Sequence, residues 1–321
     1  MRIPRRRTRV PTRRASRGRD DAAEGVRTLS VVVTGASSGI GRATALALAR
    51  RGTRLVLAAR SASSLDEVAA ECRSLGGEAI AVPTDVADPD QISLLAATAI
   101  ERFTSIRGWV SAAGVYAAGS VEETPDRIFR RVLEVNLLGQ VYGARAALPA
   151  LRRTRGTLVL LGSVFSRVPA PMVSAYVASK HAVLGFAECL RLELLGSGVR
   201  VCTILPSTTD TPIYIHAANR TGRVVHPMPP LVSPDRVAAA IVRRLEHPRP
   251  TTVVGRTQGL GIPLRLLARP LYDRLIVAGM MHLGLRADGI PDSDGTVFEP
   301  DPASNTVDGG WRQRGGPSNE Q

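Results

Sequence analysis

Apolar, strand-like runs alternate with helix-like segments along most of this chain, and this alternation most constrains the fold. The first run, residues 28–34, is β-branched and leads through the glycine-rich turn Gly35–Gly41 into a helical pattern that ends near Arg51. Later runs of the same kind lie at residues 54–59, 78–83, 107–112, 157–161, 199–205 and 251–254. Continuous apolar strands joined by helical crossovers indicate a parallel sheet that is covered on both faces. We therefore predict an α/β fold built on a doubly wound parallel sheet.

The two ends of the chain lack this pattern. Residues 1–27 contain ten arginines against three acidic residues, a net charge of +7 within the chain's total of +14. Residues 288–321 are rich in Gly, Pro and Asp and poor in core residues. Such segments bury too little apolar surface to fold, so we predict disordered tails around a single domain at residues 28–287. We interpret the first tail as a dispensable basic extension; an arm attracted to nucleic acid or membranes and a targeting peptide are the alternatives.

The glycine-rich turn lies between the first strand and the first helix. Glycines there let the backbone turn sharply and approach a pyrophosphate, whose charge meets the helix N-terminus. The spacing is neither GxGxxG nor a Walker loop, so the signal comes from its place at the first strand–helix turn, which indicates a Rossmann-like dinucleotide site. The predicted contacts are Gly35, Ser37, Ser38, Gly39, Ile40 and Gly41.

The end of the second strand indicates which cofactor binds. An acidic residue about 20 residues beyond the loop would bind the ribose hydroxyls of NAD. Residues 55–64 contain no acid, and Arg60 stands there instead. Because a guanidinium suits a 2′-phosphate, we predict NADP(H) in preference to NAD(H); the alternative is a solvated arginine in an arginine-rich chain. After the third strand, Asp85 would accept a hydrogen bond from the adenine amino group, or it would cap the turn.

A tyrosine and a lysine carry the chemistry. Tyr176 and Lys180 are four residues apart at the start of a predicted helix, so they share one helical face. Lys180 is the only lysine among the 42 basic residues. A fixed cation favours the ionised phenol and lowers its pKa, which would make Tyr176 a usable general acid and base. Taken alone, the spacing is common by chance, and a core tyrosine beside a solvated lysine is the alternative.

Together these motifs resemble the short-chain dehydrogenase/reductase family over about residues 28–255. The run from Thr34 to Gly41 reads Thr-Gly-x-x-x-Gly-x-Gly and fits the family's cofactor motif. Tyr176-x-x-x-Lys180 fits its active-site motif, and Ser163 lies thirteen residues before the tyrosine, as the family's catalytic serine does.

Two further matches complete the resemblance. Asn136, within a helix predicted to run from about Thr124 to Arg153, matches the family's catalytic asparagine. The pair Asp85-Val86 matches its adenine-side pair. The family's subunits usually associate through the helices that carry the asparagine and the tyrosine, so the resemblance implies a homodimer or homotetramer.

The resemblance also implies a mechanism. Tyr176 would exchange a proton with the substrate oxygen while a hydride moves between nicotinamide and substrate carbon, and Ser163 would hydrogen-bond the same oxygen. Lys180 would lower the tyrosine pKa and hold the nicotinamide ribose. Asn136 would support a water chain that resupplies the proton, and Thr208 would lie near the nicotinamide.

Two positions depart from the family pattern. The Asn-Ala-Gly that follows the fourth strand in the family is Ala112-Ala113-Gly114 here, which removes an asparagine that braces the sheet and the adenosine side. The Pro-Gly after the sixth strand is Pro206-Ser207. Serine lacks the freedom of glycine at positive φ, so we expect a perturbed nicotinamide position.

The substrate region has a weaker signature. Residues from about 211 to 231 are rich in Pro and Gly and are predicted to form a mobile lid, in which Arg220 and Arg223 either are solvated or grip an anion. Apolar residues near the strand ends favour an apolar alcohol, ketone or aldehyde; these are Val115, Tyr116, Phe165 and Met172. Residues 259–286 are apolar with interspersed arginines. They are interpreted as a helix pair packed on the domain or on a partner subunit, with an amphipathic element resting on a membrane surface as the alternative.

Other classes of function find little support. The histidines and the three scattered cysteines have no ligand spacing, so we predict no metal site and a reducing, cytoplasmic location. A GxSxG elbow is missing, which disfavours a serine hydrolase. An aromatic content of 4% disfavours specific nucleic-acid binding. The alternative to an enzyme is a catalytically silent nucleotide sensor, which Ala112, Ser207 and the basic tail would favour.

Overall fold

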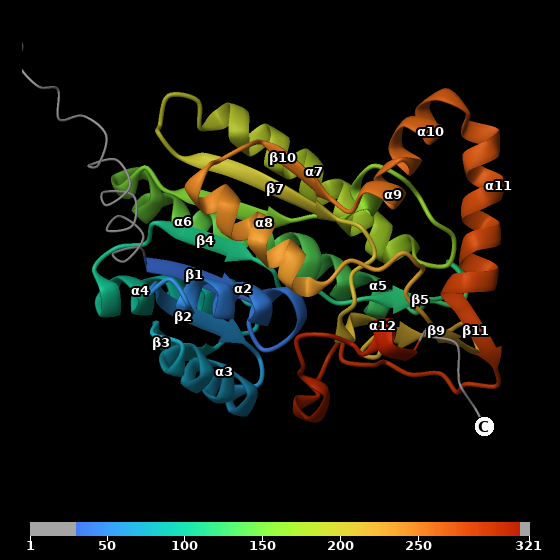
Figure 1. Ribbon diagram of the computed structural model, residues 1–321, viewed down its shortest axis with the longest axis horizontal. Coiled ribbons are helices and arrows are strands. Elements are labelled where there is room, and N and C mark those ends of the chain that lie inside the picture. The colour runs from blue at the N-terminus through green and yellow to red at the C-terminus, as the bar shows by residue number, and fades with distance from the viewer. Residues whose placement is uncertain (1–29, 315–321) are drawn as a thin grey trace, which may run out of the picture.

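The computed structural model describes residues 30–314; the predicted tail at residues 1–27 and residues 315–321 lie outside the described residues. Seven parallel strands form the central sheet in the order β10-β7-β6-β4-β1-β2-β3 (Figure 1). They are β1 (Ser30–Thr34), β2 (Arg54–Ala59), β3 (Glu78–Pro83), β4 (Gly108–Ser111), β6 (Thr157–Leu161), β7 (Arg200–Pro206) and β10 (Thr251–Val254). The order runs outward from β1 in two directions, which confirms the predicted doubly wound α/β fold.

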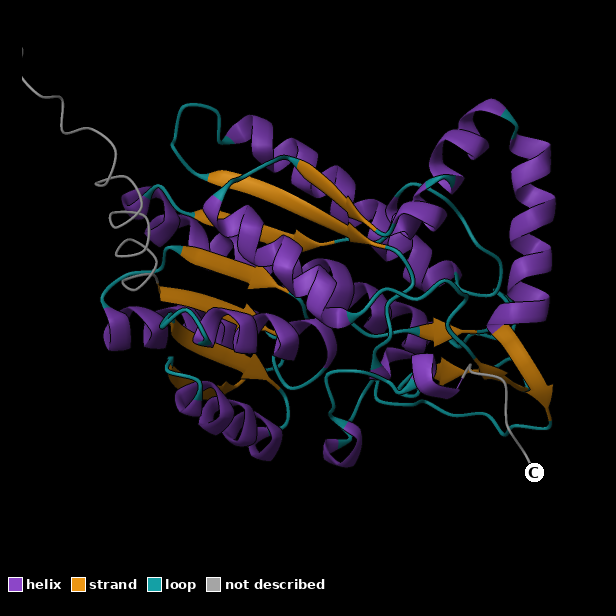
Figure 2. Ribbon diagram, viewed as in Figure 1, coloured by secondary structure: helices purple, strands orange, loops and turns teal. Residues whose placement is uncertain are grey.

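Helices cover both faces of this sheet (Figure 2). Successive strand residues point to opposite faces, so Val32 packs into one core while Val31 and Val33 pack into the other. One core is closed by α4 (Pro89–Phe103), α5 (Asp126–Leu133), α6 (Gly139–Thr154) and α7 (Ser174–Glu193). The other is closed by α2 (Gly39–Ala49), α3 (Ala62–Ser74) and α8 (Pro234–Glu246).

The helix predicted from Thr124 to Arg153 is divided in the structure. A π-helical turn, η1 (Glu134–Leu138), separates α5 from α6. Such turns alter the direction of side chains locally and are frequent at functional sites. Asn136 lies in the middle of this turn.

The chain beyond β7 builds a second layer over the carboxyl ends of the strands. Its short elements are η3 (Pro212–Tyr214), β8 (Ala218–Asn219), which pairs with β5 (Ala117–Ala118), and β9 (Arg223–Val225), which pairs with β11 (Leu285–Asp288). Between β10 and β11 lie α9 (Arg256–Gly259), α10 (Gly261–Leu267), α11 (Arg269–Gly279) and the π-turn η4 (Met280–Gly284). In Figure 1, α10 and α11 stand at the edge of the molecule as a helical pair.

Residues 289–314, which we call the C-terminal strap, correct the prediction of a disordered tail from residue 288 onward. The strap runs back from β11 along the molecule and carries η5 (Pro302–Ser304) and α12 (Trp311–Arg314) (Figure 1). Val297 is fully buried, and Trp311 is 9% exposed. The composition of the strap is poor in apolar residues, but Val297 and Trp311 are buried and Phe298 packs against the core, while much of the remainder is held by polar contacts.

Candidate active site

A cavity of about 820 Å³ opens at the carboxyl ends of the parallel strands. Ligands bind at this end in open α/β sheets. Its walls include the glycine-rich turn, the end of β2, the end of β6, the first turns of α7 and the loop after β7. Every predicted site residue lines it except Asn136, namely Gly35, Ser37, Ser38, Gly39, Ile40, Gly41, Arg60, Asp85, Val86, Ser163, Tyr176, Lys180 and Thr208.

Tyr176 and Lys180 occupy the first two turns of α7, as their spacing predicted. The Lys180 ammonium lies 5.5 Å from the centre of the Tyr176 ring and donates a hydrogen bond of 2.9 Å to the carbonyl oxygen of Leu161. Lys180 is only 3% exposed. Ser163, two residues after β6, hydrogen-bonds the tyrosine side chain. The structure therefore brings all three groups together at one point of the cavity.

The direction of the tyrosine pKa differs from the prediction. Desolvation raises the pKa of Tyr176 to about 12, and the hydrogen bond with Ser163 opposes this increase without cancelling it. Burial also lowers the pKa of Lys180 to about 8. A pattern of residues shows that a lysine is close to a tyrosine, but it does not show how dry the site is, and desolvation disfavours both charged forms. At neutral pH the phenol is thus protonated.

Asn136 lies behind the cavity and is fully buried. Its side-chain oxygen accepts a hydrogen bond of 2.8 Å from the backbone N–H of Val115, and its amide donates one of 3.0 Å to the Val115 carbonyl. The amide also donates to the Ser179 hydroxyl at 3.1 Å. A side-chain Cβ placed on Gly114 would lie 3.3 Å from the asparagine oxygen and 3.9 Å from the Lys180 nitrogen. Asn136 therefore fixes the loop after β4 beside the lysine.

The glycine-rich turn is built so closely that a side chain has no room at two of its glycine positions. Gly35 has φ +68°, and a Cβ there would approach the Ala113 backbone to 2.6 Å. A Cβ on Gly41 would lie 2.0 Å from the Gly35 carbonyl oxygen. The turn thus holds its backbone N–H groups at the N-terminus of α2, as a phosphate-binding turn requires.

Ser207 replaces the family glycine without strain. Among the described residues, the non-glycine positions with positive φ are Thr104, Arg155 and Met172, so the Ser207 backbone needs no glycine. The room for its side chain comes from Gly255, because a Cβ on Gly255 would lie 1.8 Å from the serine oxygen. The backbone strain on which the expected change in nicotinamide position depended is therefore absent.

The two residues that were predicted to contact the adenosine side of the cofactor are engaged by other parts of the chain. The Arg60 guanidinium donates hydrogen bonds to the carbonyl oxygens of Thr296 and Phe298 in the C-terminal strap. It is therefore not the solvated arginine that the sequence left open. The Asp85 carboxylate binds Arg131 and accepts a bond of 3.0 Å from the Ala87 N–H, so it does cap the turn after β3.

Aromatic side chains form the substrate end of the cavity. The ring of Tyr116 lies 4.7 Å from that of Tyr176 and 5.5 Å from that of Tyr214, centre to centre. Phe165 approaches Tyr176 edge-on at 6.5 Å. Leucines from α10, α11 and the turns beside them extend this apolar wall; they are Leu260, Leu264, Leu267, Leu275 and Leu283. Within residues 30–314, no group of His, Cys, Asp and Glu is arranged to hold a metal ion.

The sequence did not reveal the residues of the strap that border the site. Thr296, Pro300, Asp301 and Asn305 all line the cavity. Asp210, which follows the loop after β7, accepts backbone hydrogen bonds from Gly309, Trp311 and Arg312. The signal that could have found this segment is Trp311, because a tryptophan in a Gly/Pro-rich end needs a surface to pack on.

A sequence profile of the short chain dehydrogenase family matches residues 30–221, more than half of the chain. The chain therefore belongs to this family: it is a short-chain dehydrogenase/reductase, an oxidoreductase that uses a nicotinamide cofactor.

Individual proteins agree with this assignment. An uncharacterised oxidoreductase of Bacillus subtilis, YxnA, is 34% identical over 257 residues, 78% of this chain and 72% of its own. The bovine dehydrogenase/reductase SDR family member 7B is 32% identical over 265 residues, 79% of this chain and 82% of its own. An alcohol dehydrogenase of the archaeon Thermococcus sibiricus, solved with 5-hydroxy-NADP, has a TM-score of 0.64 and 29% identity. That match covers 97% of the archaeal chain and 72% of this one, so part of this chain has no counterpart there.

Proposed function

We propose that this protein is an NADP(H)-dependent enzyme that interconverts an apolar alcohol and its ketone or aldehyde. The observation that carries the proposal is the meeting of Tyr176, Ser163 and Lys180 at one point of the cavity, beside a turn that requires glycine at positions 35 and 41. The cradle fits a dinucleotide, because the turn, Arg60 and Lys180 line one continuous space of a size typical for ligand pockets. A bound nicotinamide would supply or accept the hydride.

The side chains divide the remaining work. Tyr176, protonated at neutral pH, gives its proton to the carbonyl oxygen during reduction. Ser163 donates a hydrogen bond to the same oxygen as negative charge develops on it. Lys180 holds the ribose hydroxyls and, when charged, stabilises the tyrosinate that forms. Oxidation of an alcohol needs the tyrosinate first, so we expect the reductive direction to dominate near neutral pH.

Arg60 supports the preference for NADP(H). It lies at the end of β2, where the adenosine ribose is expected, and no acid accompanies it on that turn. The structural relative from Thermococcus sibiricus was solved with an NADP derivative. A guanidinium forms charge-assisted hydrogen bonds with a phosphate and gains nothing comparable from a ribose hydroxyl.

The lining of the cavity supports an apolar substrate. Tyr116, Phe165 and Tyr214 surround the reacting point, and leucines of α10 and α11 lead from it to the surface. On that surface Leu266 and Leu267 are 80% and 87% exposed, beside Arg265 and Arg269. The helix pair packs on the body of the domain through its inner side, where Ile262, Tyr272 and Ile276 join a cluster with Val164 and Val168. Its exposed leucines and arginines favour contact with an anionic membrane surface.

We further propose a cytoplasmic location and assembly as a homodimer or homotetramer through α5, α6 and α7. The free cysteines at 72, 189 and 202 suit a reducing compartment. No helix within residues 30–314 combines the length and apolarity that a membrane crossing requires.

The decisive experiment measures nucleotide binding and turnover together. NADPH and NADH are titrated by fluorescence, and oxidation of NADPH is then followed with a panel of apolar ketones and aldehydes. Tighter binding of NADPH and turnover that disappears in Tyr176→Phe would support the proposal. Binding of neither nucleotide would refute it, whereas binding with no turnover on a broad panel would favour a nucleotide sensor.

A further inference from the structure

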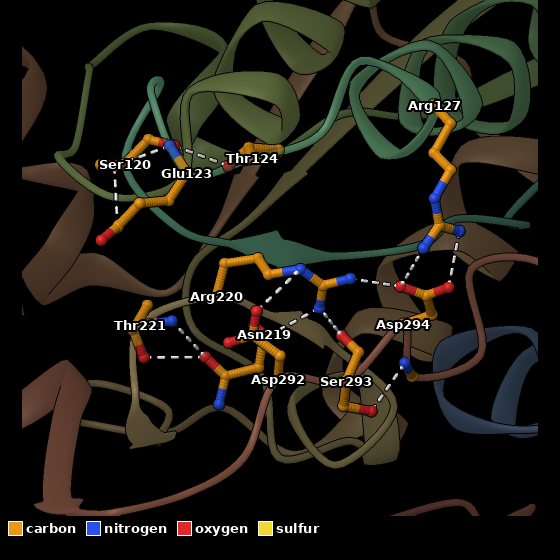
Figure 3. A network of polar contacts seen from close by, with 11 residues as sticks. Ser120, Glu123, Thr124, Arg127, Asn219, Arg220, Thr221, Asp292, Ser293 and Asp294 are labelled. Carbon is orange, nitrogen blue, oxygen red and sulfur yellow. Dashed lines mark hydrogen bonds and ion pairs between the residues drawn. The ribbon is translucent and has the colours of Figure 1, made fainter.

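The C-terminal strap is fastened at both of its ends. At its start, Asp294 forms a two-pronged ion pair with Arg127, at 2.6 and 3.0 Å, and a second ion pair with Arg220 (Figure 3). Arg220 also donates a hydrogen bond of 2.6 Å to the Ser293 carbonyl, so it grips the strap instead of being solvated. Arg127 comes from α5 and Arg220 follows β8, which means that this attachment joins three separate parts of the chain.

The far end is held by a single buried carboxylate. Asp210 is 3% exposed, and its two oxygens accept hydrogen bonds of 3.0 to 3.1 Å from the N–H groups of Gly309, Trp311 and Arg312. The Trp311 indole also donates to the Thr211 carbonyl at 3.1 Å. Three N–H groups on one buried carboxylate make a strong, directional attachment.

Between these ends, the strap binds the groups that a dinucleotide phosphate needs. Arg60 donates to the strap carbonyls of Thr296 and Phe298. The N–H of Gly39, in the glycine-rich turn, donates a hydrogen bond of 2.8 Å to the Thr306 carbonyl. Arg42, in the first turn of α2, donates one of 2.7 Å to the Asn305 carbonyl. Neutral carbonyl oxygens of the strap thus accept the hydrogen bonds that these donors would otherwise give to anionic phosphate oxygens.

We propose that the strap is a competitive gate on the cofactor site, released when a phosphorylated dinucleotide takes over its donors. This inference rests on the proposed binding of NADP(H) at this cavity. A phosphate accepts stronger hydrogen bonds from Arg60 and Gly39 than a peptide carbonyl does, because the bonds are charge-assisted. The cofactor cannot bind while the strap is closed. Its apparent affinity is therefore the intrinsic affinity multiplied by the fraction of molecules in which the strap is open.

The gate acts on both nucleotides by the same factor. NADPH carries the 2′-phosphate that can replace the carbonyls on Arg60, whereas NADH offers only hydroxyl groups at that point, so NADPH displaces the strap at a lower concentration. Because the closed fraction does not depend on which nucleotide is added, releasing the strap should tighten the binding of both and leave the ratio of their affinities unchanged. The family profile ends at residue 221, so the strap lies outside the part of the chain that it matches.

The test uses full-length variants that loosen one attachment at a time. Asp294→Asn removes the charge that Arg127 and Arg220 bind, and Asp210→Asn weakens the other end. Asp308→Asn is the matched control, because its carboxylate accepts its hydrogen bond from Gly310 inside the strap. Dissociation constants are measured for NADPH, NADH and adenosine 2′,5′-bisphosphate, and amide exchange is followed in residues 289–314 with and without NADPH.

The gate predicts that Asp294→Asn and Asp210→Asn bind NADPH about three- to tenfold more tightly, with an equal gain for NADH, while Asp308→Asn stays at the wild-type value. In the wild type, NADPH should speed amide exchange in the strap. Weaker binding in the two variants, together with slower amide exchange on adding NADPH, would show that the strap clamps the bound cofactor. Unchanged binding would show that the strap is inert. Either result overturns the gate.

Asp294 is 35% exposed, so the Asp294→Asn variant should fold even if Asp210→Asn does not. If no form binds any nucleotide, the dinucleotide assignment itself fails, which is distinct from failure of the gate alone.

Discussion

The inner and outer walls of the cavity are built in opposite ways. Lys180 on the inner wall, and Asn136 directly behind that wall, are buried and hydrogen-bonded to the backbone of Leu161 and Val115, so neither can move without breaking the core. On the outer wall, the strap is held by ion pairs such as that of Asp294 and by carbonyls that a better acceptor can displace. The difference teaches that in this protein the chemistry is fixed, whereas access to it is adjustable.

The largest expected effect is on turnover, when the proton donor Tyr176 on the inner wall is changed. Tyr176→Phe removes the proton donor and leaves the ring, so we expect turnover to fall by about 10²- to 10⁴-fold. The dissociation constant for NADPH and the midpoint of urea unfolding should stay near wild type. Tyr142→Phe, on α6, is the control and should keep full activity. If Tyr176→Phe retained a tenth of the wild-type rate, the assigned proton donor would be wrong.

The buried lysine can be observed directly, because the chain contains only one. Incorporating ¹³C-labelled lysine gives a single side-chain signal, whose shift should titrate near pH 8 instead of at the ordinary value of 10.5. Because the pKa in the folded state lies below that in the unfolded state, the unfolded chain binds more protons between these values. Because of Lys180, the free energy of unfolding should therefore rise with pH between about 8 and 10.5. This contribution is lost as the pH falls through 8. A midpoint above pH 10 in the folded protein would contradict the desolvated environment.

Removing the inner brace should cost stability. Asn136→Ala leaves the N–H and C=O of Val115 unpaired in the core, which we expect to lower the free energy of unfolding by about 2–4 kcal/mol. The matched change on the outer wall is Asn305→Ala, whose amide makes one partly buried hydrogen bond of 2.8 Å to Ser64. It should cost about 1 kcal/mol or less. Urea denaturation of both variants measures the contrast, and equal losses would remove the distinction between the walls.

The smallest effect concerns the choice of cofactor. Arg60→Ala should reduce the preference for NADPH over NADH by about tenfold, the value of one lost charge-assisted interaction. Competitive titrations of the two nucleotides give the ratio. The control is Arg73→Ala on α3. The Arg73 guanidinium donates a hydrogen bond of 2.9 Å to the Ala79 carbonyl, and its removal should leave the ratio unchanged. A ratio unaffected by Arg60→Ala would assign the preference to another residue.

The sequence predicted those parts that depend on local patterns. The parallel sheet followed from apolar runs at regular spacing, and the turn from Gly35 to Gly41 and the pair Tyr176 and Lys180 followed from short spacings on elements of known direction. The strap could not be predicted in this way, because Arg60 and Thr296 are 236 residues apart and nothing local links them. The pKa of Tyr176 was missed for a related reason, since desolvation depends on residues brought in by tertiary packing.

The close fit of Ser207 against Gly255 has a consequence for anyone who redesigns this chain. A Cβ on residue 255 would overlap the serine oxygen, and the φ of +108° at Gly255 is one that residues with side chains rarely adopt. A side chain at 255 would therefore need two concessions, the loss of the serine side chain at 207 and a new backbone conformation at 255 itself.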